Sequence, residues 1–213
     1  MASEMMHLFV GYVLKDRLQV QRLSPFYMGC IAPDSVHFAG DVPKEERWGR
    51  HVRHKNLAVW AEQAWEFYDS RPDSADTDLW LGYYIHLLTD IAWDAGEHDE
   101  IWMEMKRLDL PRISKFGAGW DDCFRFDYQQ MHESWWTEEV QPALRSVKGE
   151  AMPGLSATTI EKFAHRIAEQ PCECEGIPCP PIMVTHDCVL RLAEQVWQLF
   201  SHEGSDPSCE ISR

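Results

Sequence analysis

An all-α fold is predicted for this sequence of 213 residues by its hydrophobic period and by its helix caps. Apolar side chains recur at every third or fourth position in most segments, whereas the strict alternation typical of strands is nearly absent. Serine, asparagine and aspartate stand immediately before several of these segments, where their side chains can cap helix N-termini. These features predict a bundle of helices.

The first half of the chain is predicted to contain a series of short helices. Ser3 caps a helix that extends to about Leu18. Pro25 opens a second helix, which ends before Pro33 because the residue preceding a proline resists the α conformation. Residues 36–50 contain two glycines and a proline and are expected to form a loop. Further helices are expected at residues 56–69, 81–94 and 97–108.

The second half is divided by a change of composition at KGEAMPGLSATT. Before this segment, one long helix is expected from about residue 121 to residue 140; after it, helices are expected at 157–170 and 184–202. We therefore predict that residues 1–148 form a metal-binding helical core. Residues 149–213 are predicted to form a helical extension that packs on the same domain.

The composition is that of a globular protein, and its charge argues against binding to polyanions. The net charge of −15 argues against a nucleic-acid surface and against binding to anionic lipids, since both rely on Lys and Arg. No apolar run approaches the roughly 18 residues of a transmembrane segment, and no signal peptide is expected. The seven cysteines are odd in number and lack the spacing of a disulfide framework, which favours a reducing compartment and hence a cytoplasmic protein.

Ionisable side chains interrupt the otherwise apolar stretch LGYYIHLLTDIAWD at residues 81–94. His86 and Asp90 are four residues apart and share one helix face, and Gly82 leaves space on that face one turn earlier. An ionised carboxylate buried there needs a partner, water or a cation. The same spacing recurs outside any buried helical pattern, in the pairs His37/Asp41 and His202/Asp206.

Other segments supply residues of the same kind. In the first helix, His7 lies among apolar residues with a glycine one turn away. Asp34 directly follows a proline, whose bend can aim the carboxylate into the same polar pocket; capping of the next turn is the alternative interpretation. His51 and His54 stand close to the start of the following helix.

This mixture of histidine and aspartate suits zinc, manganese or iron. In its order along the chain, the set resembles the zinc-dependent phospholipase C family, which is related in fold to the P1-type nucleases. The resemblance is strongest to small bacterial members, covers about residues 3–130, and is carried by the Met-His-Leu start, the Pro-Asp pair, the loop histidine and the run HLLTD. It implies a multi-helix bundle of the phospholipase C and P1 nuclease type.

The resemblance also implies the ligands, which are His7, Asp34, His54, His86 and Asp90. Asp90 would bridge or bind metal, and Asp34 would bind metal or orient the nucleophile, so these two carboxylates are the catalytic candidates. His51 is the rival of His54 as the loop ligand. The implied activity is hydrolysis of a small phosphorylated substrate by a metal-activated water, with one or two zinc ions and manganese or iron as alternatives.

Two alternative functions are kept. An HD-type phosphohydrolase is also helical and metal-dependent, and its adjacent His-Asp pair occurs at His186 and Asp187, without a suitably spaced His before it and Asp after it. The non-enzymatic alternative is a helical binding protein whose metal is structural.

Two further polar clusters are interpreted as structural. Asp122 and Asp127, with His132, are expected on an exposed amphipathic face rather than at the metal site. A structural zinc in the cysteine-rich loop is not favoured, because its cysteines lack the paired Cys-x2-Cys spacing. Its candidate ligands are Cys172, Cys174, Cys179, His186 and Cys188.

Overall fold

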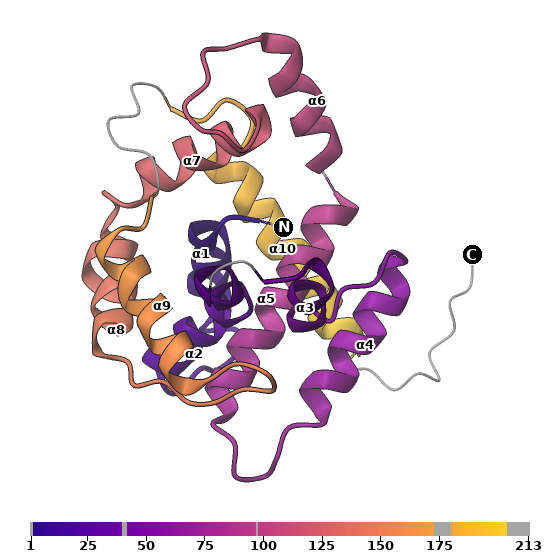
Figure 1. The fold of residues 1–213 in the computed structure, drawn as a ribbon, viewed down its shortest axis with the longest axis vertical. Helices are drawn as coiled ribbons and strands as arrows, with labels where there is room; N and C mark the ends of the chain where they lie inside the picture. Colours follow the sequence, from indigo (N-terminus) through magenta and orange to yellow (C-terminus); the bar gives the residue numbers. More distant parts are fainter. Residues whose placement is uncertain (1, 40–41, 97, 173–179, 204–213) are drawn as a thin grey trace.

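A computed structural model describes residues 2–39, 42–96, 98–172 and 180–203 of the chain (Figure 1). Within these ranges every regular element is a helix, which confirms the predicted all-α class. The elements are α1 (Glu4–Leu14), α2 (Leu23–Ile31), the 3-10 helix η1 (Ala32–Ala39), α3 (Lys44–Arg50), α4 (Leu57–Asp69), α5 (Thr77–Ala95), α6 (His98–Leu108), α7 (Ala118–Gln130), the π-helix η2 (Trp135–Val140), α8 (Gln141–Ser146), α9 (Ala157–Glu169) and α10 (His186–Glu203).

Side-chain caps determine where several of these helices begin. The hydroxyl of Ser3 accepts a hydrogen bond from the backbone N–H of Met6, so α1 starts at the predicted place. Asn56 caps α4 in the same way, and Asp76 caps α5. Each cap satisfies backbone N–H groups that have no partner within the first helical turn.

Helix α5 lies at the centre of the bundle, and every residue from Asp78 to Trp93 is buried. Helix α2 crosses it in close backbone contact. A Cβ added to Gly82 would lie 2.1 Å from the carbonyl oxygen of Phe26, and one added to Gly29 would lie 2.2 Å from the carbonyl oxygen of Leu79. The space predicted beside Gly82 is therefore filled by the backbone of α2.

The other helices surround this crossing (Figure 1). Helix α1 packs on α2, α5 and α10, and α4 packs along α5. From the C-terminal segment, α9 packs on η1 and α8, while α10 packs on α1 and α5. This packing brings together, inside the bundle, the N-terminal ends of α1 and η1 and the middle of α5.

Three predicted elements differ from the structure. Helix α1 ends at Leu14, and the chain continues to Leu18 as turns. The predicted loop at 36–50 contains most of η1 and all of α3. The single helix predicted at 121–140 is wrong, since α7 ends at Gln130 and a turn separates it from η2.

No described helix is long and apolar enough to cross a bilayer. The cytoplasmic location stays a prediction of the sequence.

Candidate metal centre

Ionisable side chains from four elements meet where α1, η1 and α5 come together. All are buried, and they form two overlapping groups whose ligand atoms lie within 4.8 Å of one another. One group is His7, His86 and Asp90; the other is Asp34, His51 and His86. His7 comes from α1, Asp34 from η1, His51 from the C-terminal cap of α3, and His86 and Asp90 from α5.

Most of the His–Asp distances in this cluster are longer than hydrogen bonds. The Nε2 atom of His7 lies 3.6 Å from Asp90 Oδ1, and that of His86 lies 3.7 Å from Asp90 Oδ2. Two ligand atoms each about 2.1 Å from a tetrahedral ion would be about 3.4 Å apart. The observed separations are therefore close to those of atoms that share an ion.

Backbone carbonyls orient two of the imidazole rings. The Nδ1 atom of His86 lies 2.8 Å from the carbonyl oxygen of Cys30, and that of His51 lies 2.9 Å from the carbonyl oxygen of Arg47. A ring that donates from Nδ1 to a carbonyl directs Nε2 to the opposite side, as histidine ligands of metals do. Both Nε2 atoms accordingly face the carboxylates.

His7 and His86 are the clearest sign that the cluster is suited to a cation. Their rings stack with centroids 3.7 Å apart and an interplanar angle of 12°. Three buried nitrogen atoms have no hydrogen-bond partner among the described residues: Nδ1 and Nε2 of His7, and Nε2 of His86. Buried polar atoms without partners are uncommon and need an explanation, and a bound ion would supply one.

The protonation states of His7 and His86 agree with this interpretation. Burial, followed by the charge of His86, lowers the pKa of His7 to about 3, and burial also lowers the pKa of His86. Both rings are therefore neutral near pH 7, as a metal ligand must be. Burial alone would raise the pKa of Asp34, but the neighbouring histidines and a hydrogen bond from His51 outweigh it and lower this pKa, so the carboxylate is ionised. Burial alone would lower the pKa of His51, but its hydrogen bond to Asp34 and the charges of Asp34 and Asp90 raise it, so an ion would have to displace a proton from that ring.

Asp34 and Asp90 also have direct hydrogen bonds. His51 Nε2 lies 3.0 Å from Asp34 Oδ1, and the backbone N–H of Ala2 donates to Asp90 Oδ1 at 3.0 Å. The N-terminal segment is thus attached directly to a carboxylate of the cluster.

The structure places His54 outside the cluster and His51 inside it. His54 is exposed, and its Nδ1 accepts a hydrogen bond from the backbone N–H of Asn56 at 3.0 Å. Between the two histidines the chain turns at Val52, which has a φ of 48°. This left-handed turn separates the directions of the two side chains, so the rival His51, and not His54, belongs to a candidate metal group.

Asp122 and Asp127 are buried, so the exposed face predicted for them is wrong, and both have structural partners. Asp122 accepts hydrogen bonds from the backbone N–H groups of residues 182–184, and Asp127 accepts one from the Ser3 hydroxyl at 2.6 Å. His132 is exposed. None of the three belongs to the candidate metal groups.

The remaining candidates also lie away from the cluster or outside the described residues. His186 and Asp187, the pair required by the HD hypothesis, are exposed at the start of α10 and belong to neither candidate group. Cys172 and Cys188 are buried. Four candidates lie outside the described ranges, namely Asp41, Cys174, Cys179 and Asp206.

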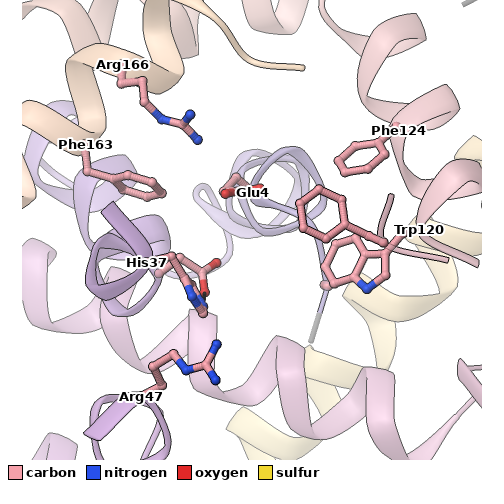
Figure 2. Close-up of a pocket in the computed structure, with 10 residues that line it drawn as sticks. Glu4, His37, Arg47, Trp120, Phe124, Phe163 and Arg166 are labelled. Atoms are coloured by element: carbon pink, nitrogen blue, oxygen red, sulfur yellow. Dashed lines mark ion pairs between the residues drawn. The ribbon is translucent and has the colours of Figure 1, made fainter. Parts of the chain in front are cut away.

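A cavity of about 510 Å³ reaches the cluster at Asp34 (Figure 2). His37 and Arg47 lie on one side of it, and Trp120 and Phe124 lie on the opposite side, as Figure 2 shows. The complete lining is Ala2, Glu4, Asp34, His37, Arg47, Phe116, Trp120, Phe124, Phe163 and Arg166. Apart from Asp34, these residues were not predicted from the sequence, because they come from α1, η1, α3, α7, α9 and the loops and share no motif.

Comparison with protein-family models, with curated proteins and with solved structures gives no match to this chain. The class of the protein is set by its fold and by the cluster: it is an all-helical protein with buried His/Asp groups that could hold a metal ion.

Proposed function

We propose that this chain is a metal-dependent phosphoester hydrolase with a helical bundle of the phospholipase C and P1 nuclease type. The observation that carries the proposal is the buried cluster of three histidines and two aspartates, with unpartnered His7 and His86 nitrogens, at the end of a cavity large enough for a small substrate. Its ligands are His7, Asp34, His51, His86 and Asp90.

The donor set favours zinc, with manganese or iron as alternatives. Imidazole nitrogens and carboxylate oxygens are the ligands of catalytic zinc sites. The two candidate groups share His86, and one imidazole nitrogen binds one ion at a time. A second ion would therefore depend on Asp34 and His51, and Asp90 could join them because its Oδ2 lies 3.8 Å from His51 Nε2.

Divalent ions in such a site activate water for attack on phosphorus and neutralise charge on the phosphoryl oxygens. The chain itself supplies the geometry. The carbonyls of Cys30 and Arg47 fix the rings of His86 and His51, and Asp34 reaches from the cluster into the cavity lining. Asp34 is thus the carboxylate best placed to orient a water beside a substrate.

The test is turnover by the zinc-loaded protein of 4-nitrophenyl phosphate and bis(4-nitrophenyl) phosphate. We expect hydrolysis of at least one ester, loss of that activity in Asp90→Asn, and retention in Asp69→Asn, which changes an exposed carboxylate on α4. A folded protein that binds zinc tightly, melts at a lower temperature without it and turns over neither ester would contradict the proposal and favour a structural metal. Loss of metal in His186→Ala, but not in His86→Ala, would favour the HD hypothesis.

A further inference from the structure

The cavity beside the cluster has two chemically different sides (Figure 2). Positively charged Arg47 and Arg166 enter it from α3 and α9, together with His37 of η1, and the ring of Phe163 lies on the same side. On the other side are three aromatic residues from α7 and the loop before it, which are Phe116, Trp120 and Phe124. In a chain with a net charge of −15, two arginines in one cavity are a marked local departure from the overall charge.

The guanidinium group of Arg47 has no ion-pair partner among the described residues. Its Nε is buried and has no hydrogen-bond partner among the described residues. The Nε of Arg50 is likewise buried and without a hydrogen-bond partner among these residues, but Arg50 forms an ion pair with Glu46 at 3.0 Å. Arg53 pairs with Asp94. A half-buried guanidinium without a carboxylate partner among the described residues is suited to an anion that comes from outside the chain.

The position of Arg47 places that anion next to the metal centre. The carbonyl of Arg47 holds His51, whose Nε2 contacts Asp34, and the side chain of Arg47 lines the same cavity as Asp34. The polar lining also contains the negative charges of Asp34 and Glu4. Because Asp34 belongs to the proposed ligand set, its charge would be offset by metal when substrate is bound.

The aromatic side forms a continuous wall. Ring centroids are 6.5 Å apart for Phe116 and Trp120 and 6.0 Å apart for Trp120 and Phe124. Phe116 is 51% exposed, which is unusual for a phenylalanine and leaves its ring available to a ligand. Such a wall binds apolar or planar groups through burial and stacking.

We propose that the cavity selects phosphomonoesters with an apolar or aromatic organic group, with Arg47 on the phosphoryl group and the organic group on the wall formed by Phe116, Trp120 and Phe124. This inference rests on the proposed function. A monoester has a second pKa of about 6 and is a dianion at pH 8, so it gains more from an added guanidinium than a diester monoanion does. Hydrolysis would form a P–O bond to water and break the ester P–O bond, and the two protons of the water would end on phosphate and on the leaving alcohol or phenol.

Binding of phosphonates that cannot be hydrolysed tests this inference independently of turnover. With zinc-loaded protein and isothermal titration calorimetry, we expect phenylphosphonate to bind more tightly than methylphosphonate. Arg47→Met should weaken phenylphosphonate binding about 10-fold to 100-fold, the range for a lost hydrogen bond to a charged group. Arg145→Met, which changes an exposed arginine on α8, should leave it unchanged.

The aromatic wall has its own variants. Trp120→Ala should remove most of the preference for phenylphosphonate over methylphosphonate while leaving methylphosphonate binding unchanged, and Phe124→Ala is a second variant if Trp120→Ala does not fold. Melting temperature and zinc content of each variant identify folded, metal-loaded samples.

Equal phenylphosphonate affinity in Arg47→Met and Arg145→Met would overturn the inference, as would equal affinity of the wild type for the two phosphonates. Hydrolysis of bis(4-nitrophenyl) phosphate with a higher kcat/KM than 4-nitrophenyl phosphate would overturn the monoester preference while supporting the proposed hydrolase function. Arginine-dependent phosphonate binding without turnover of either ester would support the anion site and contradict the hydrolase.

Discussion

His51 and His54 provide an internal comparison for the metal centre, because they are three residues apart and only one of them points into the cluster. The side chain of His51 is 1% exposed, and its Nε2 lies 3.0 Å from Asp34 Oδ1. His51→Ala would remove a proposed ligand and also the hydrogen bond that holds Asp34. Loss of an outer partner of a ligand lowers metal affinity by about 10-fold to 100-fold, so loss of the ligand itself should cost about 100-fold or more.

The assay is zinc affinity measured by competition with a chromophoric chelator, together with the melting temperature of the metal-free protein. His54→Ala is the matched control, and we expect wild-type zinc affinity because its ring is exposed. Its stability should change by about 0.5 kcal/mol or less, as for most surface substitutions. Equal zinc affinity in folded His51→Ala and in His54→Ala would refute the assignment of His51, and a weakened His54→Ala would restore His54 as the ligand.

Three further predictions concern packing, the α10 anchor and metal linkage. Gly82→Ala should destabilise the fold by about 3 kcal/mol or more in urea unfolding, because its Cβ would lie 2.1 Å from the Phe26 carbonyl oxygen. Gly49→Ala, which has nothing within 4 Å of its added Cβ, should stabilise α3 by about 0.5–1 kcal/mol. An equal loss of stability in Gly82→Ala and Gly49→Ala would contradict the close crossing of α2 and α5. Asp122→Ala should cost about 3 kcal/mol with unchanged zinc content, since its partners are the backbone N–H groups of 182–184; lost zinc would instead make it a ligand. Removal of zinc with a chelator should lower the melting temperature, and zinc should restore it, whereas a melting temperature indifferent to zinc would exclude tight binding to the native state.

The sequence predicted the helices whose own residues determine their ends. Helices α4 and α5 begin one residue after Asn56 and Asp76, whose side chains cap them. Helix α5 is apolar over most of its buried length, and it starts four residues before the predicted residue 81. The break at residues 131–134 has no glycine or proline to mark it. Pro142 in the first turn of α8 lacks the N–H that would bond to the carbonyl of Glu138, so it bears on the π-helical η2 and not on the break before it.

Helix α3 was missed for a different reason. Glycine and proline at its ends are typical of a loop, but tertiary contacts fix the segment. The indole N–H of Trp60 donates to the carbonyl of His51 at 2.9 Å, and Tyr83 donates to the carbonyl of Arg50. Contacts between residues so distant in sequence leave no local pattern.

Four of the five residues proposed from the sequence for the metal site meet in the structure. His7, His86 and Asp90 were identifiable because a polar group on an apolar helix face needs a partner, and Asp34 because a proline bend precedes it. The choice between His51 and His54 depends on the positive φ of Val52, a conformation that a β-branched residue rarely adopts and that its sequence does not predict.

The central claim is that the buried His/Asp cluster holds metal, and elemental analysis of the purified protein tests it most directly. After incubation with zinc and removal of free ions, we predict about one or two ions per chain in the wild type and in Asp69→Asn, and a large loss in Asp90→Asn. A folded wild-type protein that retains no zinc, manganese or iron, or an Asp90→Asn variant that retains the full wild-type content, would contradict the claim.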